Sequence, residues 1–259
     1  MRKLTRFNDR PTSAITRRDL IGRAASTAVS VVVSQALLGC AASDATAASA
    51  DTTGSSTTSP SCVLTAALTE GPYFVDEKLN RSDIRTDPVT GAVSPGVPLQ
   101  LTFSVSRYQS NACTALTGAY LDVWHCDDGG VYSDVSGTGS GHKFLRGYQI
   151  TDANGQVVFE TIYPGWYQGR AVHIHFKLRL FAGSTKTYEF TSQFFMPESL
   201  TDTVHALSPY SVKGKRDTLN ANDGIYNSLT TAQKAALTLQ ATSVSGGYAG
   251  VINLDVNVG

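Results

Sequence analysis

A succession of short segments, in which apolar and polar residues alternate between turn-forming residues, constrains the fold of this 259-residue chain most strongly. The segments are LQLTFSVSR (99–107), GAYLDVWHC (118–126), QVVFETI (156–162), AVHIHFKLRLF (171–181), TYEFTSQFF (187–195) and GVINLDVNV (250–258). Successive side chains of a strand point to opposite faces of a sheet, so each segment predicts a strand with one buried face. Short alternating runs split by Gly, Asn and Asp turns predict an all-β fold, an antiparallel β-sandwich.

Two long segments between the expected strands, 129–147 and 200–227, are rich in Gly, Ser and Asp. Loops of this length in a compact domain are usually functional or mobile. We therefore expect long loops of the sandwich to form the functional site. The segment SLTTAQKAALTLQA (228–241) predicts a short helix.

Residues 1–39 have the layout of an export signal, because Arg17 and Arg18 precede an apolar run from Ala24 to Leu38. This arrangement is typical of a twin-arginine signal. The run ends in ALLGC, which resembles a bacterial lipoprotein cleavage box and makes Cys40 the expected lipid attachment site. A plain signal peptide cut within AASDATAAS is the alternative. We expect a bacterial protein exported by the twin-arginine route and either anchored to the cell envelope or extracellular.

Residues 40–61 are mostly Ala, Ser, Thr and Gly and predict a flexible tether, so the folded domain is expected over 62–259. Residues 1–39 hold seven Lys or Arg and two Asp or Glu, which leaves the rest of the formally neutral chain with a net charge of −5. An acidic body argues against a nucleic-acid partner. No run of about 20 apolar residues occurs, so a lipid anchor is the only membrane attachment expected. The sequence predicts no oligomeric state.

Cysteines Cys62, Cys113 and Cys126 follow the expected signal and anchor. Outside the cytosol cysteines tend to pair, and an odd number leaves one over. Cys126 lies in an apolar strand beside Trp124, which favours a buried single thiol. We therefore expect a disulfide between Cys62 and Cys113.

The segment YPGWYQGRAVHIHFK (163–177) places two histidines on alternate positions of an expected strand. His173 and His175 share one face, while Ile174 takes the other, so both imidazoles can bind one metal ion. Taken alone, such a pair is more often a hydrogen-bonded pair of strand histidines. The surrounding residues favour a metal site, because Tyr167 lies on the preceding Pro-Gly turn and Tyr132 follows DDGG in a loop.

Two tyrosines and two histidines as ligands would favour iron. Phenolate is a hard anionic donor, two phenolates offset much of the charge of a trivalent ion, and imidazole also suits iron. Zinc sites favour Cys, His and carboxylate ligands instead. Cys126, Asp127 and Asp128 keep zinc as an alternative, although no C-x-x-C pair supports it.

Longer segments of the chain carry a resemblance to a known family. They are TEGPYF (69–74), LTGAYLDVWHCDDGGVYS (116–133), FLRGYQITDANGQVVFETIYPGWYQGRAVHIHF (144–176), TSQFF (191–195) and NDGIY (222–226). This set resembles the intradiol ring-cleavage dioxygenases, such as catechol and protocatechuate dioxygenases, and is most similar to their secreted bacterial relatives. The combination of P-G-x-Y and R-x-x-H-x-H with an upstream G-x-Y is specific, whereas no single piece is.

The resemblance implies a non-haem Fe(III) cofactor held by Tyr132, Tyr167, His173 and His175. Arg170 matches the arginine over the substrate ring, with a surface arginine paired with Asp127 or Asp128 as the alternative. Gln193 matches, more loosely, a glutamine near the site. Tyr73 matches a residue that lines the substrate pocket.

Two features depart from the family pattern. Trp166 precedes Tyr167, where protocatechuate enzymes often have proline, so a different pocket rim that includes Trp166 is expected. The helical N-terminal domain that dimerises the cytosolic catechol enzymes has no counterpart, so the dimer of those enzymes is not carried over to this chain.

The implied activity is cleavage of a small aromatic diol between its two hydroxylated carbons, with both atoms of O2 incorporated into a muconate-type diacid. Tyr167 would take one substrate proton, and Arg170 would stabilise negative charge on the ring. A transthyretin-like β-sandwich binding module without catalysis, or a zinc hydrolase on the same scaffold, are the alternatives. The identity of the catechol depends on the shape of the pocket.

The remaining histidines and the aromatic residues of the Pro-Gly turn have simpler interpretations. We expect His125 to be packed, His142 to be exposed, and His205 to lie outside the site. Tyr163 and Trp166 are expected either to wall the pocket or to belong to the core.

Overall fold

A computed structural model of the protein describes residues 62–259. The expected export signal (1–39), the expected tether (40–61) and the lipid attachment at Cys40 lie outside the described residues. None of the helices in the described part is long and apolar enough to cross a membrane.

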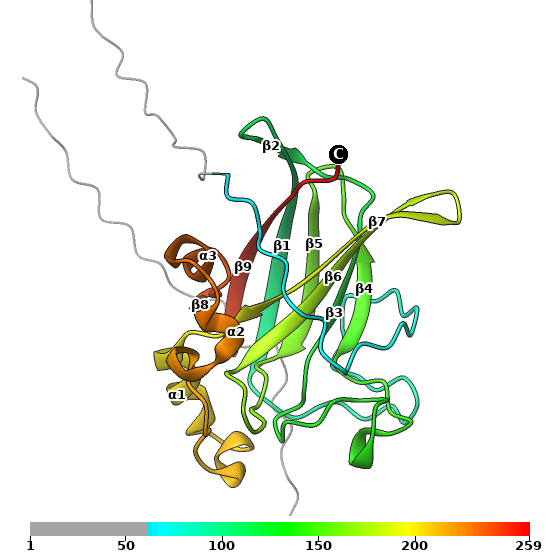
Figure 1. Ribbon diagram of the computed structural model, residues 1–259. Coiled ribbons are helices and arrows are strands. Elements are labelled where there is room, and N and C mark those ends of the chain that lie inside the picture. The colour runs from blue at the N-terminus through cyan, green and yellow to red at the C-terminus, as the bar shows by residue number, and fades with distance from the viewer. Residues whose placement is uncertain (1–61) are drawn as a thin grey trace, which may run out of the picture. The chain divides into compact units, whose positions relative to one another are not determined.

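Two β-sheets pack face to face (Figure 1). The first sheet has the strand order β2 (Ala112–Ala115), β1 (Pro98–Gln109), β9 (Gly247–Val256), β8 (Gln240–Val244), and β5 (Gln156–Ile162) also pairs with β1. The second sheet has the order β4 (Arg146–Ile150), β3 (Tyr120–Trp124), β6 (His173–Ala182), β7 (Thr185–Phe195). The predicted β-sandwich is confirmed, and its strand pairs are antiparallel apart from β1 and β9, which run parallel.

Each of the expected alternating segments contains a strand, but β2, β4 and β8 were not expected. β8 begins at Gln240, inside the segment that predicts a helix, and the helix α3 occupies only Thr231–Ala236. The residues of β8 are largely exposed, so this edge strand has no apolar face that a sequence pattern could reveal.

The core lies between the two sheets and is built from the inward-facing residues of the alternating strands. The ring centroid of Phe103 of β1 lies 6.0 Å from that of Phe159 of β5. It lies 5.9 Å from the centroids of Phe176 of β6 and Phe194 of β7. Burying a side chain of this size stabilises the fold by about 1.5–3 kcal/mol. These aromatic contacts join the two sheets and fix the position of β6 at its buried face.

The remaining helices are short. They are α1 (Glu198–His205) and α2 (Gly224–Asn227), with 3-10 turns at Gly137–Gly139, Tyr210–Lys213 and Asn220–Asn222. In Figure 1 the three α-helices lie on one side of the sandwich. A capping box of Thr230 and Gln233 begins α3, and the side chain of Asp223 caps α2.

The segment that precedes β1 is tied to both sheets. Its backbone N–H groups at Thr65, Leu68 and Arg81 donate to carbonyl groups of β9, β7 and β4 respectively. A disulfide joins Cys62 to Cys113 of β2, and Cys126 is a buried free thiol, which agrees with the pairing expected from the sequence. This segment therefore has fixed anchors on either side of Tyr73.

Candidate metal centre and active site

The first residues of β6 place two imidazoles side by side. His173 and His175 are buried and point away from the core, whereas Ile174 and Phe176 belong to it. The Nε2 atoms of the two histidines lie 3.0 Å apart. The alternation of side chains along a strand, expected from the sequence, thus brings both rings to one point.

Hydrogen bonding and stacking fix the orientation of each ring. Nδ1–H of His173 donates to the carbonyl oxygen of Ala171 over 2.6 Å, which leaves the Nε2 lone pair facing His175. The ring of His175 stacks on the indole of Trp124, with centroids 5.0 Å apart and 8° between the planes. Nδ1 of His175 is buried without a hydrogen-bond partner in the described part of the chain.

Both histidines are held neutral. Burial lowers the pKa of His173 to about 3, and burial likewise lowers the pKa of His175 well below its ordinary value. Neutral imidazoles with converging Nε2 lone pairs are the form in which histidine binds a metal ion. A hydrogen-bonded Nδ1, as in His173, is typical of a metal-binding histidine.

Two phenol groups complete the cluster. The hydroxyl of Tyr167 lies 3.1 Å from Nε2 of His173, and that of Tyr132 lies 3.5 Å from the same atom. Tyr132 comes from the loop after β3, and Tyr167 comes from the loop between β5 and β6. The structure therefore brings together the four residues that the resemblance names as metal ligands.

The loops that carry the tyrosines are bound to each other through their backbones. Gly165 N–H donates to the carbonyl of Asp127 over 3.0 Å. A Cβ atom at Gly165 would lie only 2.3 Å from the carbonyl oxygen of Asp128, so this close approach requires glycine. Lys213 adds a second connection, because its Nζ donates to the carbonyls of Gly129 and Trp166.

Without a cation both phenols are neutral at ordinary pH. Burial raises the pKa of Tyr167 to about 12 and raises the pKa of Tyr132 well above its usual value, while the charge of Arg170 opposes the rise at both. Two buried phenols and two neutral imidazoles thus share one small volume. A trivalent metal ion fits this donor set, since it would stabilise phenolates that burial alone disfavours.

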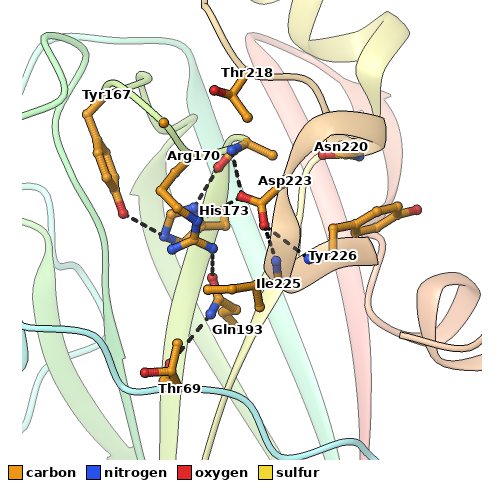
Figure 2. A network of polar contacts seen from close by, with 12 residues as sticks. Thr69, Tyr167, Arg170, His173, Gln193, Thr218, Asn220, Asp223, Ile225 and Tyr226 are labelled. Atoms are coloured by element: carbon orange, nitrogen blue, oxygen red, sulfur yellow. Dashed lines mark hydrogen bonds and ion pairs between the residues drawn. The ribbon is translucent and has the colours of Figure 1, made fainter. Parts of the chain in front are cut away.

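Arg170 lies beside the cluster and is held by two buried polar groups (Figure 2). Its Nε donates to Asp223 over 2.8 Å, and Nη2 donates to Oε1 of Gln193 over 2.5 Å. The partner of Arg170 is therefore Asp223, not Asp127 or Asp128, which the sequence left as the alternative. Gln193 itself is on β7, directly opposite His175 of β6.

Tyr73 packs on the cluster from the opposite direction. Its ring stacks on Tyr132 with centroids 4.4 Å apart and meets Tyr167 edge-on at 6.0 Å. Lys177, which shares the face of β6 with the two histidines, anchors this segment by an ion pair with Glu70 and a cation–π contact at 3.9 Å to Phe74. The position of Tyr73 next to the tyrosine pair is therefore set by buried contacts of β6.

The aromatic residues of the Pro-Gly turn take different roles. Tyr163 is fully buried, and its hydroxyl lies 2.7 Å from Oγ1 of Thr201, so it is a core residue. Trp166 is half-buried, donates from Nε1 to the carbonyl of Gly214 over 3.2 Å, and lies 4.7 Å below Nζ of Lys213. Trp166 thus joins the turn that carries Tyr167 to the loop after α1.

The other histidines have partners away from the cluster. His125 is buried with ring nitrogens 2.8 Å from the carbonyl of Cys126 and 2.6 Å from Oγ1 of Thr161, so it is packed as expected. His142 is partly exposed and pairs with Asp87 at 2.7 Å. His205 contacts the carbonyl of Pro164 at 3.0 Å.

The donor set proposed for zinc does not assemble around the histidine pair within residues 62–259. Oδ1 of Asp127 accepts from the backbone of Val131 over 2.8 Å, and the thiol of Cys126 faces the carbonyl of Gly165. Within the described residues, Cys62, Cys113 and Asp255 form a group of Cys and carboxylate side chains close enough to share a metal ion. Its two sulfurs are joined in a disulfide, so they are not available as thiolate ligands.

Sequence reasoning did not assign a role to Asp223 or Lys213. Asp223 lies in the NDGIY segment, which carries part of the resemblance, but nothing in the sequence links it to Arg170, from which it is separated by 53 positions. Lys213 lies in an expected loop without any motif.

Comparison with known proteins places this geometry in a family. Residues 69–199, which include both tyrosines, both histidines, Arg170 and Gln193, match a family model described as Dioxygenase. A chlorocatechol 1,2-dioxygenase from Rhodococcus opacus is 31% identical over 105 residues, which is 40% of this chain and 39% of that protein. The chain therefore spans about two fifths of the length of that curated relative.

Solved structures extend the similarity across the sandwich. An intradiol ring-cleavage dioxygenase from Tetranychus urticae is 29% identical with a TM-score of 0.66, covering 76% of this chain and 96% of that one. The dioxygenase domain of a dioxygenase carbohydrate-binding protein fusion from the cellulolytic bacterium Streptomyces sp. SirexAA-E is 27% identical with a TM-score of 0.53, covering 76% and 100%. By its matched segment, its fold and these relatives, the chain belongs to the intradiol ring-cleavage dioxygenase family.

Proposed function

We propose that this protein is a non-haem Fe(III)-dependent intradiol dioxygenase. It cleaves a catechol-type aromatic diol between the two hydroxylated carbons and incorporates both atoms of O2 into a muconate-type diacid. The observation that carries the proposal is the convergence of two phenol oxygens and two imidazole nitrogens, with Nε2 of His173 within 3.5 Å of the other three atoms. The family typically uses non-haem ferric iron.

Tyr132, Tyr167, His173 and His175 would hold the metal. When bound, ferric iron supplies the Lewis acidity that retains the doubly deprotonated diol and activates its ring toward O2. The hydrogen bond from His173 to Ala171 and the stack of His175 on Trp124 preset the two imidazoles for this task. Little reorganisation of the protein would then be required when the metal enters.

Tyr167 is the group best suited to accept a substrate proton. It is less buried than Tyr132 and lies on the turn that follows Pro164 and Gly165. Burial raises the pKa of its phenol to about 12, so a released Tyr167 phenolate would take a proton from a catechol hydroxyl readily. Tyr132, held against Tyr73 and fully enclosed, would remain in place.

Arg170 would act on the ring of the substrate. Its charge lowers the pKa of both tyrosines and both histidines, because the guanidinium lies near all four groups. A cation fixed in advance beside developing negative charge lowers the barrier without reorganisation. Gln193 would contribute by holding Nη2 of Arg170. Tyr73 and Trp166 would bound the space for the substrate on either side of Tyr167.

Oxygen uptake by the iron-loaded protein tests the proposal. A panel of catechols, including catechol, protocatechuate, chlorocatechol and hydroxyquinol, should contain substrates that consume one O2 per diol and yield a product with the absorbance of a muconate. A colourless protein that hydrolyses esters without oxygen would instead support a zinc hydrolase. Stoichiometric iron without uptake on any diol would defeat the enzymatic proposal and favour a binding module.

We also propose that the protein is exported by the twin-arginine route and acylated at Cys40. The basis is the sequence alone: the Arg17–Arg18 pair, the apolar run and the ALLGC box. Replacing both arginines by lysine should retain the precursor in the cytoplasm of a bacterial host. Cys40→Ser should release an exported but lipid-free protein, and unchanged membrane association of that variant would refute the anchor.

A further inference from the structure

Asp223 is buried at the start of α2 and uses its whole carboxylate in hydrogen bonds (Figure 2). Oδ2 accepts from Nε of Arg170 over 2.8 Å and from the backbone N–H of Ala171 over 2.9 Å. Oδ1 accepts from the backbone N–H groups of Ile225 and Tyr226 over 2.8 and 3.0 Å. One side chain therefore connects a helix start to the loop that precedes the histidine pair.

We infer that Asp223 is the positioning residue that aims Arg170 at the substrate and, through Ala171, supports the orientation of His173. This inference rests on the proposed dioxygenase function. Ala171 accepts the Nδ1 proton of His173 on its carbonyl while donating its own N–H to Asp223. The carboxylate of Asp223 thus holds the side chain of Arg170 and, through the backbone of Ala171, the ring of His173.

Arg170 is clamped from two directions. Asp223, at the start of α2, accepts a hydrogen bond from Nε, and Gln193 of β7 accepts one from Nη2. Both accepting side chains are fully buried. Nη1 has no hydrogen-bond partner within the described part of the chain, so both of its N–H groups are free to meet a substrate. Because the guanidinium is planar, two fixed nitrogens determine where the third points.

The charge of Asp223 matters as well as its geometry. The side chain of Arg170 is only 18% exposed, and that of Asp223 is 0% exposed. Removing one partner of a buried ion pair leaves the other uncompensated. Burial alone would raise the pKa of Asp223, but its hydrogen bonds from Arg170, Ala171 and Tyr226 lower it, so the carboxylate stays ionised.

The competing explanation is that Asp223 only caps α2. The chain offers a matched control, because Thr230 caps α3 through its side chain and no contact links it to the metal cluster. Loss of a cap costs about 1 kcal/mol in either place. Asn caps a helix about as well as Asp, so a role in capping alone predicts that Asp223→Asn leaves stability and turnover near the wild type, whereas Thr230→Ala lowers stability alone.

The test combines kinetics with a double-mutant cycle. Asp223→Asn should lower kcat for the best catechol by about 10- to 100-fold, the range of residues that support a metal site. Iron content should remain near that of the wild type, and Thr230→Ala should leave kcat within about twofold. In an Arg170→Ala background, Asp223→Asn should cost clearly less than in the wild type, because only the part of its effect that passes through Ala171 to His173 remains. An undiminished loss in that background would overturn the inference.

A readout that needs no turnover separates this inference from the proposed function. In an NMR spectrum of the metal-free protein, the Nε–H signal of Arg170, assigned by its absence in Arg170→Lys, should exchange slowly with water. Asp223→Asn should make that exchange fast, while Thr230→Ala should not. Fast exchange in the wild type would overturn the inference even if the variant fails to fold. Slow exchange in a protein inactive on every diol would instead defeat the proposed function alone.

Discussion

Nε2 of His173 lies 3.0 Å from Nε2 of His175, in a setting where burial keeps both imidazoles neutral. Two neutral lone pairs at this separation repel each other unless a proton or a cation lies between them. The hydroxyl of Tyr167 approaches the same point at 3.1 Å from His173. A metal ion bound between the two nitrogens would remove this repulsion, so bound iron should stabilise the fold as well as serve catalysis.

Removing any one of the proposed ligand groups should abolish iron binding and oxygen uptake. Tyr132→Phe and His175→Ala each remove one donor, and both variants should lose bound iron and oxygen uptake by at least about 100-fold, at the upper end of the losses seen when a metal-site partner is removed. Metal analysis and oxygen electrode measurements of each purified variant provide the check. Tyr148→Phe is a suitable control, since Tyr148 packs on Tyr120 at the outer face of β4. A Tyr132→Phe variant that retains wild-type iron content would remove Tyr132 from the ligand set.

Gly165 should tolerate no side chain. A Cβ atom there would meet the backbone oxygens of Asp128 and Asp127 at 2.3 and 2.5 Å and push apart the loops that carry the two tyrosines. Gly165→Ala should cost about 1–3 kcal/mol of unfolding free energy and weaken iron binding. Gly224→Ala provides the matched control, because a Cβ atom at Gly224 has nothing within 4 Å. Equal unfolding midpoints and iron affinities for the two variants would contradict this account.

Asp87 should make stability depend on pH in the acidic range. Burial alone would raise its pKa, but hydrogen bonds from His142, Lys143, Val89 and Thr90 lower it well below the ordinary value. A carboxyl whose folded pKa is depressed stabilises the fold above its unfolded pKa of about 3.9, and this contribution is lost as pH falls further.

Unfolding of the wild type and Asp87→Asn in urea at several pH values measures this contribution. The wild type should be the more stable protein at about pH 6, and the difference should shrink as pH falls from about 5 to 3. Thr230→Ala, which removes a helix cap and no ionisable group, should show no comparable trend. A difference between wild type and Asp87→Asn that stays constant across this range would refute the assignment.

The extent to which sequence could predict this site differs between its parts. The histidine pair follows from the period of a strand, since His173 and His175 must share a face whatever the fold around them. The pairing of two distant tyrosine loops with that face does not follow from any local rule, and the resemblance alone supplied it. Their association depends on backbone contacts such as that of Gly165 with Asp127, which leave no periodic signal.

The contacts that support the site also join residues far apart in the sequence, so no local pattern predicts them. Asp223 meets Arg170 only because the chain returns to the sandwich after α1. The sequence pattern does not predict strand β8, because β8 is an exposed edge strand with no apolar face. By contrast, the strands that line the core have alternating residues, and there the expected and observed elements agree.

Titration of metal-free protein with ferric iron, followed by visible absorption and metal analysis, tests whether the two tyrosines and the two histidines hold one metal ion. A single ferric ion should bind per chain and give the burgundy colour of phenolate-to-iron charge transfer, which should weaken in both Tyr132→Phe and Tyr167→Phe. Bound iron should also raise Tm, by about 5–10 °C if it is present at 100 times its Kd. Iron bound without colour, or a colour that neither tyrosine substitution weakens relative to the wild type, would contradict this prediction.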